Sequence, residues 1–310
     1  MITIYKSTAY GLEQLDELEN GSWISVIDPT PKEIDQIVDL GIEQDFITYP
    51  LDLDERPRTE REEDGSTLII FRIPYYQGEI SDIPFTTIPL GIIITENYII
   101  TVCKRENQII KDFASGKIRG LSTAKKYRFI LRLLLNSANL FLYHLREINK
   151  KVDQLEDELQ LSLRNRELMA ILKYQKSLVY FATALKSNEL LMVRLQRSQI
   201  FTRYAEDEDL LEDVITENQQ AIEMTNISNN ILSSMMDAFA SIISNNLNVV
   251  MKFLTSVTIV LSIPTVISSF FGMNVDLPFQ TLDYAYLVIL LICFVLAGIV
   301  IYTFMKRDWF

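Results

Sequence analysis

Hydrophobic residues form two long uninterrupted segments near the C-terminal end of the chain. The second, Tyr284 to Met305, has no charged residue in its 22 positions, and the first, residues 249–271, has none after Lys252. A helix needs about 20 apolar residues to cross a hydrocarbon core. The pattern therefore predicts membrane spans at 249–271 and 284–305, joined by a short link, with a charged soluble body before residue 248.

Polar residues recur at helical spacing through the first segment and the residues that precede it. Steps of four and three residues alternate along a set that we call the polar stripe: Asn230, Ser234, Asp237, Ser241, Ser244, Asn248, Met251, Thr255, Thr258, Ser262, Thr265 and Ser269. A seam of this period usually carries Leu or Ile. Any single Ser or Thr in a membrane helix commonly packs against a neighbouring helix or bonds to its own backbone. A stripe whose only apolar member is Met251 instead favours several copies around an axis, lining a water-filled pore.

Glycine and proline divide the rest of the chain. Eight of the ten glycines and seven of the nine prolines lie in residues 1–120, and between Gly120 and Gly272 the only breaker is Pro264. Residues 121–271 are therefore predicted to be almost entirely helical. We expect two helices folded back on each other over 122–205, with a bend at 162–165, and a third from about Asp207 to Phe271. At 1.5 Å per residue the third helix is roughly 100 Å long.

The first 120 residues have an α/β pattern. Predicted strands are Ile2–Tyr5, Trp23–Ile27, Leu68–Tyr76, Ile88–Ile94 and Tyr98–Cys103, the last two joined by a hairpin loop at 95–97. Thr30 is a predicted N-cap, with Pro31 and Glu33 announcing a helix through Leu40. No phosphate-binding glycine loop or nucleophile elbow is visible, so a regulatory or scaffolding domain is expected and an enzyme is not.

These patterns predict an α+β membrane protein in three parts. Residues 1–120 form a cytosolic α/β domain, 121–247 a helical stalk and 248–310 a transmembrane hairpin. Lys252, Lys306 and Arg307 flank the spans, whereas the link carries only the charges of Asp276 and Asp283. The positive-inside rule then places both termini in the cytosol, in a multi-pass protein of the cell membrane.

Charge and composition narrow the possible partners. The net charge of −12 argues against nucleic acid, because binding its backbone needs clustered Lys and Arg. The one histidine, His144, has apolar neighbours and is predicted to be a packed helix residue. The acidic run 206–209, followed by Glu212 and Asp213, either caps the next helix or contacts a divalent ion between subunits, and capping is the favoured interpretation.

The string Gly272-Met273-Asn274 follows the first span directly. In a ring of copies, Asn274 would place amide oxygens at the pore mouth, where a neutral ring suits a hydrated ion better than a carboxylate cage. Magnesium dehydrates reluctantly and keeps several waters. This position, between a polar-striped span and an acidic link, indicates a filter for hydrated divalent cations.

At these residues the chain resembles the CorA family of divalent-cation transporters. The resemblance rests on residues 248–255, Phe271-Gly272-Met273-Asn274 and the C-terminal run 306–310, with a weaker match at 56–60. It implies a homopentameric funnel that carries magnesium as substrate and binds it as regulatory ligand, with no separate cofactor. It also implies a filter at Gly272, Met273 and Asn274, with Asn248, Met251, Leu254 and Thr265 along the pore. The polar stripe adds Thr255, Thr258, Ser262 and Ser269 to the predicted pore lining.

The family's gating implies a cytosolic regulatory site between subunits. Asp213 matches the acid that the stalk helix contributes, and Asp52 and Asp54 lie in the region of the opposing acid. Three positions depart from the family pattern. Phe271 replaces the usual tyrosine, Ser262 replaces a bulky apolar residue, and residues 277–280 lack the usual proline-glutamate element.

Three functions remain open from the sequence. The leading hypothesis is a passive magnesium channel gated by cytosolic divalent ions. A zinc, cobalt or nickel transporter of the same superfamily is the second. The third, from another class, is a membrane-anchored sensor that no longer conducts.

Overall fold

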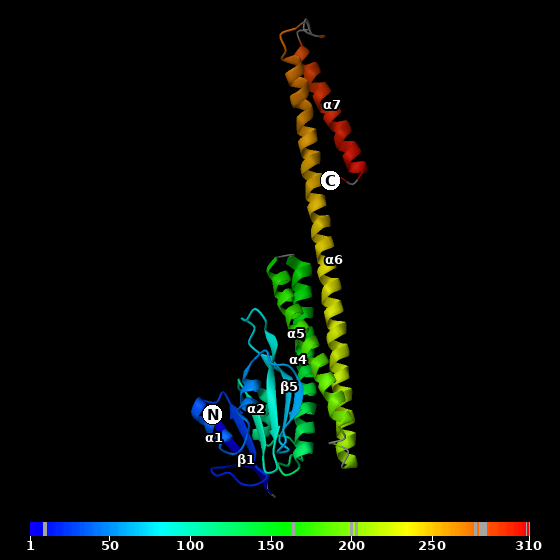
Figure 1. The fold of residues 1–310 in the computed structure, drawn as a ribbon. Helices are drawn as coiled ribbons and strands as arrows, with labels where there is room; N and C mark the ends of the chain where they lie inside the picture. The colour runs from blue at the N-terminus through cyan, green and yellow to red at the C-terminus, as the bar shows by residue number, and fades with distance from the viewer. Residues whose placement is uncertain are drawn as a thin grey trace. The chain divides into compact units, whose positions relative to one another are not determined.

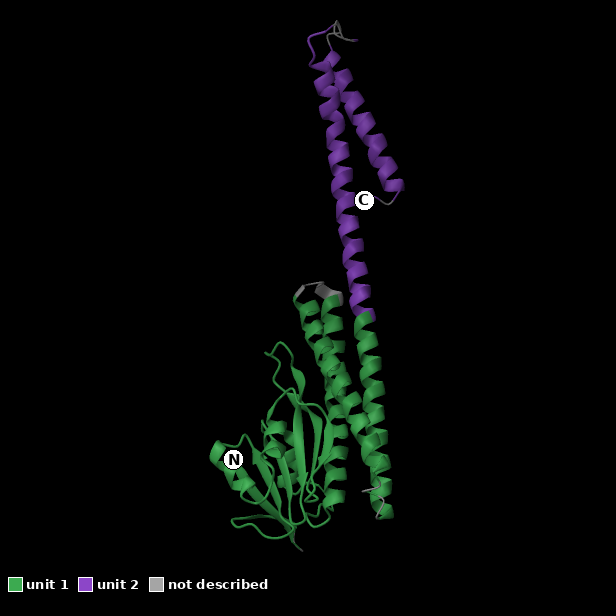
Figure 2. Ribbon diagram, viewed as in Figure 1, with its two compact units in different colours: residues 1–233 green, residues 234–310 purple. Residues whose placement is uncertain are grey.

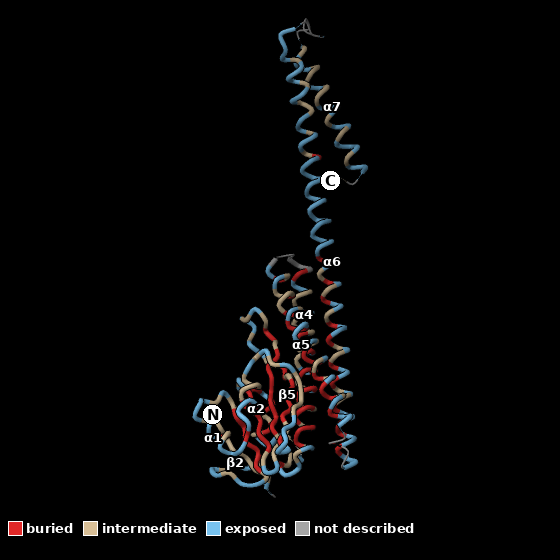
Figure 3. The backbone as a smooth tube through the Cα atoms, viewed as in Figure 1, coloured by how far each residue is buried: buried red, intermediate tan, exposed pale blue. Residues whose placement is uncertain are grey.

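The computed structural model describes residues 1–8, 11–118, 120–162, 165–198, 201, 204–275, 278, 284–307 and 309. The chain forms two compact units, residues 1–233 and 234–310 (Figure 2). Buried residues concentrate in the sheet and the helices of the first unit (Figure 3). The three-part division expected from the sequence stays a prediction.

A seven-stranded sheet forms the centre of the first unit (Figure 1). Its order is β2-β1-β3-β7-β6-β5-β4, and only the β3–β7 pair is parallel among the pairs in it. The strands are β1 (Ile2–Thr8), β2 (Gly11–Leu15), β3 (Trp23–Ile27), β4 (Arg58–Arg61), β5 (Thr67–Tyr76), β6 (Phe85–Ile94) and β7 (Ile99–Cys103). All five predicted strands are confirmed, as is the hairpin at 95–97 that joins β6 to β7.

Two edge strands, β2 and β4, were missed by the sequence pattern. Their sequences, Gly-Leu-Glu-Gln-Leu and Arg-Thr-Glu-Arg, contain few of the β-branched and aromatic residues that mark a strand. Edge strands often carry charge, which discourages pairing with another chain. The charge that protects these edges also hides them from recognition by hydrophobic pattern.

Short helices lie on both faces of the sheet, two on one face and one, at residues 108–114, on the other. Helix α1 (Pro31–Val38) begins with the predicted capping box: the Glu33 amide donates to Thr30 Oγ1 at 3.4 Å, and the Thr30 amide donates to Glu33 Oε2 at 2.8 Å. It ends two residues before the predicted end at Leu40. Helices α2 (Gln44–Thr48) and α3 (Gln108–Ala114) and the 3-10 turn Tyr49–Leu51 were not predicted, because three to seven residues show too little periodicity.

Long helices account for most of the chain after residue 125, as predicted. They are α4 (Lys126–Ser162), α5 (Asn165–Arg197), α6 (Ala205–Phe271) and α7 (Ala285–Lys306). The bend expected at 162–165 agrees with the ends of α4 and α5, although Leu163 and Arg164 lie outside the described residues. Helix α6 has 67 residues and continues through Pro264. Both α6 and α7 are long and apolar enough to cross a membrane.

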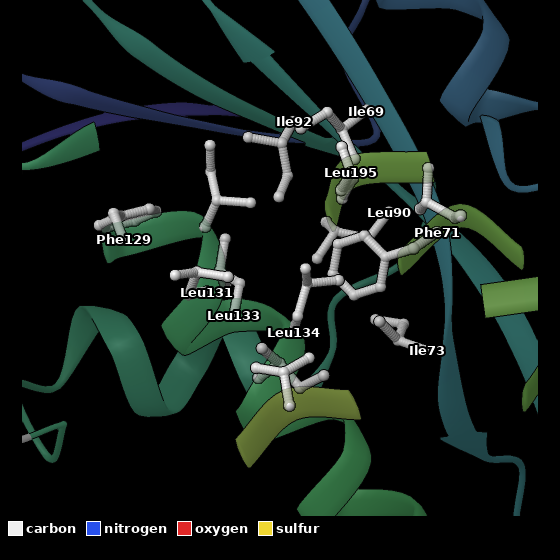
Figure 4. Packing of buried hydrophobic residues seen from close by; sticks show 14 of the residues in the cluster. Ile69, Phe71, Ile73, Leu90, Ile92, Phe129, Leu131, Leu133, Leu134 and Leu195 are labelled. Atoms are coloured by element: carbon white, nitrogen blue, oxygen red, sulfur yellow. The ribbon is translucent and has the colours of Figure 1, made fainter. Parts of the chain in front are cut away.

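Two apolar clusters lie on opposite faces of the sheet. Alternation along β3 sends Trp23 into one cluster and Ile24 and Val26 into the other. The larger cluster joins Phe71 and Leu90 of the sheet to α4 and α5, and Figure 4 shows Leu131, Leu133, Leu134 and Leu195 around them. The sheet and the long helices therefore share one core, which fixes α4 and α5 against the strands.

Candidate ion pathway

All twelve positions of the polar stripe lie on α6 and are exposed. Between residues 230 and 239 this exposure is informative, because Leu232, Met235 and Phe239 are buried on the other side of the helix. From Ala240 to Thr255 every residue is exposed, so burial does not distinguish the faces there. The single chain thus leaves the stripe without packing, available to water or to other copies.

Hydroxyl groups of the stripe donate to the backbone of their own helix. Thr258 Oγ1 donates to the Leu254 carbonyl at 2.8 Å, and Ser262 Oγ donates to the Thr258 carbonyl at 2.7 Å. Thr265 Oγ1 donates to the Leu261 carbonyl at 3.2 Å. These bonds satisfy the hydroxyl protons without any pore, which is the ordinary role of such residues in membrane helices. They also leave oxygen lone pairs directed outward as acceptors for the protons of water.

The Gly-Met-Asn string forms the turn that ends α6. The Gly272 amide donates to the Ser268 carbonyl at 2.9 Å, and the Met273 amide donates to the Phe270 carbonyl at 3.4 Å. A Cβ at Gly272 would lie 3.3 Å from the Ser268 oxygen, which gives a local reason for glycine there. Asn274 is exposed. Asp276, Leu277, Phe279, Gln280 and Asp283 of the link lie outside the described residues.

The three acids expected at the regulatory site are all exposed. Asp213 lies on α6, and Asp52 and Asp54 follow the 3-10 turn, where the Asp54 amide donates to Asp52 Oδ1 at 3.0 Å. Within the described part of the chain, no three His, Cys, Asp or Glu side chains are arranged to hold a metal ion. One copy alone therefore does not assemble this site, and the roles assigned to these acids stay predictions.

A partly buried arginine, which sequence reasoning missed, holds the loop that carries Asp52 and Asp54. Arg72 of β5 donates from Nη2 to the Leu53 carbonyl at 3.1 Å and from Nη1 to the Glu55 carbonyl at 2.8 Å. Burial lowers the pKa of Arg72, an effect that the nearby Asp54 and Asp52 carboxylates oppose. The sequence signal was a single charged residue inside the apolar run Leu68–Tyr76.

The acidic run at the start of α6 lies where capping was predicted and also pairs with an arginine of α4. Glu206, Asp207 and Glu208 lie in its first turn, where the helix dipole favours negative charge. In addition, Arg128 Nε of α4 donates to Asp207 Oδ1 at 2.6 Å, and Arg128 Nη2 lies 2.7 Å from Glu206 Oε2. The hydrogen bond to Asp207 raises the pKa of Arg128. The run thus ties α6 to α4, a link that the sequence did not reveal.

The weaker motif at 56–60 has a local structural role. Arg58, in β4, pairs with Glu55 and with Glu60, whose Oε1 lies 2.6 Å from Arg58 Nε. The Arg58 guanidinium also lies 4.6 Å from the centre of the Tyr49 ring. These contacts connect the edge strand to the turn before Asp52.

Comparisons with known proteins match one family along nearly the whole chain. The family model described as CorA-like Mg2+ transporter protein matches residues 19–307. A cobalt/magnesium transport protein CorA of Methanocaldococcus jannaschii is 31% identical, over 100% of this chain and 99% of the relative. A protein of the same name from Thermotoga maritima is 22% identical, over 93% and 83%. The complete structure of the Methanocaldococcus jannaschii CorA magnesium transporter matches with a TM-score of 0.87 at 26% identity, covering 100% and 99%.

Proposed function

Because the chain belongs to the CorA family of Mg2+ transporters, we propose that it forms a passive channel for hydrated divalent cations, with magnesium as the main substrate. The observation that carries this proposal is the polar stripe, which stays on one register of a single continuous helix and leads to Gly272-Met273-Asn274. A narrow stripe on one helix cannot enclose water. Five copies around an axis, each turning the stripe inward, can do so.

The filter proposed here is a ring of Asn274 side chains that recognises the ion through its hydration shell. Amide oxygens accept hydrogen bonds from bound water without the strong attraction of a carboxylate, so the ion can leave again. Below the filter, Thr265 and the other outward-facing oxygens of the stripe accept further protons of that shell. Met251 and Leu254, both exposed in the single chain, would form an apolar constriction that dewets when closed.

Membrane potential supplies the driving force for this influx. One elementary charge gains about 2.3 kcal/mol per 100 mV, and a divalent ion gains about twice that. No group-transfer chemistry is needed, so we propose a transporter and not an enzyme, in a membrane that α6 and α7 cross with both ends in the cytosol.

The proposed filter is tested by replacing Asn274 in protein reconstituted into liposomes. Asn274→Ala should lose most of the Mg2+ flux, because the ring of oxygens disappears. Asn246→Ala is the matched control, since this exposed amide lies two residues from Asn248 and so roughly opposite it on α6. Equal flux in wild type and N274A would remove Asn274 from the filter. No flux in the wild type at any magnesium concentration would instead favour a non-conducting sensor.

Ion choice is measured in the same liposomes. The names of the relatives include cobalt as well as magnesium, so Co2+ flux is expected beside Mg2+ flux. Zn2+ and Ni2+ are the comparison ions, and a preference for either over Mg2+ would overturn the choice of substrate.

Gating is proposed to depend on Asp213 facing Asp52 or Asp54 of another copy. Magnesium bound between these carboxylates would hold the copies together and keep the pore closed, and falling cytosolic magnesium would release them. Asp213→Ala should therefore reduce inhibition of flux by magnesium on the cytosolic side. Glu223→Ala, an exposed acid ten residues further along the same helix and outside the acidic run, is the control. Unchanged inhibition in D213A would place the sensor elsewhere.

A further inference from the structure

Arg72 of β5 binds the backbone of residues 52–55, which we call the acidic loop. Its guanidinium donates to the Leu53 carbonyl at 3.1 Å and to the Glu55 carbonyl at 2.8 Å. Two further bonds go to Thr87, from Nε to Oγ1 at 2.9 Å and from Nη2 to the carbonyl at 2.7 Å. These four acceptors are all neutral oxygens. Arg72 therefore holds the acidic loop by its backbone and not by its carboxylates.

The carboxylates of Asp52 and Asp54 stay free of ion pairs. An arginine close to carboxylates commonly forms bidentate pairs with them. Here Glu55 pairs with Arg58, whereas in the described part of the chain neither Asp52 nor Asp54 pairs with a basic side chain. Burial lowers the pKa of Arg72, and the Asp54 and Asp52 carboxylates oppose that effect, so both lie within reach of its charge. This arrangement leaves two exposed carboxylates available to another cation.

Asn188 of α5 fixes the backbone of Arg72. Strand β4 pairs with β5 as far as Arg58, which lies opposite Ile70. Two residues further along β5, the Arg72 amide donates to Asn188 Oδ1 at 2.9 Å, and Asn188 Nδ2 donates to the Arg72 carbonyl at 2.8 Å. Asn188 is only 1% exposed. Its amide thus takes the place of a strand beside β5, where buried backbone groups need partners.

The alternation of side chains along β5 lets Arg72 join two layers. Phe71 and Ile73 enter the apolar cluster shared with α4 and α5, so Arg72 leaves the sheet on the opposite face, with Ile70. The 3-10 turn Tyr49–Leu51, which directly precedes the acidic loop, packs against that face. The backbone of Arg72 is therefore bonded to α5 while its side chain is bonded to the loop.

Helix α5 is also bonded to α6, on which Asp213 lies. Asn218 Nδ2 of α6 donates to the Leu185 carbonyl of α5 at 3.3 Å, and both residues are buried. Asn218 follows Asp213 by five residues, and Leu185 precedes Asn188 by three, which is less than one turn. The acidic loop and the segment that carries Asp213 are thus held to the same part of α5.

We propose that Arg72 and Asn188 are positioning residues of the cytosolic regulatory site. Arg72 sets the position of the acidic loop and leaves Asp52 and Asp54 free for a divalent cation, and Asn188 fixes this arrangement to α5. The inference rests on the gating proposed above, in which these acids face Asp213 of another copy. Groups that orient metal ligands from behind are commonly worth about 10-fold to 100-fold in metal affinity.

Inhibition curves of two Arg72 variants separate position from charge. Arg72→Lys keeps the positive charge but loses the planar fork that spans two carbonyls, whereas Arg72→Gln loses both. In liposomes, the cytosolic Mg2+ concentration that halves the flux should rise about 10-fold to 100-fold in both variants, each compared with its own flux without cytosolic Mg2+. If Arg72 acted through its charge alone, R72K would match the wild type. R72Q would then be inhibited at lower Mg2+, because a repelling charge is removed. That pattern would overturn the inference.

Two further variants complete the series. Arg56→Gln is the matched control, because this exposed arginine directly follows the acidic loop, and it should keep the wild-type curve. Asn188→Leu has a similar size but cannot bond to the backbone of Arg72, so it should raise the half-inhibiting concentration as R72K does. A wild-type curve in N188L would overturn the role of Asn188.

Hydrogen exchange of the full chain in detergent measures the loop directly. The Asp54 amide donates to Asp52 Oδ1 and the Glu55 amide donates to the Asp52 carbonyl, so their exchange reports how well the loop is held. Both amides should exchange faster in R72K and N188L, while β6 and β7 stay protected. Unchanged exchange in the loop would contradict the inference. Faster exchange across β6 and β7 as well would show that these residues hold the whole sheet, which would also contradict it.

Failure of this inference differs from failure of the proposed gating. If D213A loses inhibition by Mg2+ while R72K keeps the wild-type curve, the regulatory site stands and Arg72 does not position it. If D213A keeps wild-type inhibition, the regulatory site itself is refuted, and the positioning role with it.

Discussion

His144 lies in a small pocket of about 220 Å3 between the sheet and helices α4 and α5. Its ring centre is 5.1 Å from that of Phe85, and Glu79, Glu147 and Lys151 line the same pocket. Burial disfavours the imidazolium and lowers the pKa of His144 to about 4. The prediction of a packed helix residue is therefore confirmed, and the ring is neutral at pH 7.

The low pKa of His144 predicts a pH-dependent free energy of unfolding. Between about pH 6.5 and pH 4 the unfolded chain binds a proton at this residue and the folded chain does not, so stability falls as pH falls. The loss amounts to roughly 2–3 kcal/mol over that window. His144→Phe should flatten the curve between pH 5 and 6.5, because the chain has no other histidine. Urea unfolding of the full chain in detergent, followed by the fluorescence of buried Trp23, measures this. Equal slopes in the two proteins would contradict it.

Side-chain contacts between distant residues mark the limit of what the sequence could reveal at this scale. The 4-3-4 spacing of Ile148, Val152, Leu155 and Leu159 predicts an apolar seam on α4, in which Ile148, Val152 and Leu159 are buried and Leu155 is partly buried. The bond between Arg128 and Asp207 joins residues 79 positions apart, and no local pattern announces it. Because helix capping was a sufficient reason for acids at the start of α6, their pairing with Arg128 was missed.

At the scale of elements, the contact between the first turns of α4 and α6 predicts unequal effects of its two acids. Asp207 is almost completely buried, whereas Glu206 is largely exposed. Asp207→Asn should destabilise the first unit by about 1–3 kcal/mol, because the Arg128 charge loses a poorly hydrated partner. Glu206→Gln should cost less than about 1 kcal/mol, since solvent screens that pair. Urea unfolding measures the free energy of unfolding of both variants. Equal losses in D207N and E206Q would show that burial of the acid does not determine its contribution to stability.

A close approach between β6 and the 3-10 turn gives a second element-scale prediction. A Cβ at Gly91 would lie 2.2 Å from Pro50 Cγ, so one of the two elements must shift. Gly91→Ala should cost about 1–3 kcal/mol, as overpacking does. Gly298→Ala, where a Cβ meets no atom within 4 Å, should leave stability nearly unchanged. Thermal unfolding followed by fluorescence compares them, and a fully stable G91A would show that the turn yields freely.

For the whole molecule, the proposed ring of copies predicts which residues of α6 and α7 water reaches. With Cys103 and Cys293 replaced by serine, Thr265→Cys should react with a charged thiol reagent, because the proposed ring turns the stripe toward the pore. Ile299→Cys, on α7, where residues 285–305 carry no charge, should stay unreacted. Labelling in liposomes followed by mass shift measures both. An unreactive T265C together with a reactive I299C would show that the water path does not follow the stripe.

Whole-molecule features were also the least predictable from residues alone. The lengths of α6 and α7 follow from hydropathy and from the absence of breakers, and the structure confirms them. The polar stripe indicated several copies but did not determine the number of subunits, because each copy presents the same face whatever the size of the ring. The opposing partner of Asp213 was undetermined for the same reason, because the proposed regulatory site lies between copies.

Because the helix from Ala205 to Phe271 is continuous, the proposed pore depends on the helical register of its residues as well as on their identity. The polar stripe repeats every 3.5 residues, so in that register seven residues make two full turns. Inserting one alanine after Ala240 shifts every downstream stripe position by about 100° from the positions before it, whereas inserting seven residues restores the register. Mg2+ flux should therefore vanish with the one-residue insertion and largely return with the seven-residue insertion. Helix α6 should thus tolerate insertions of whole heptads.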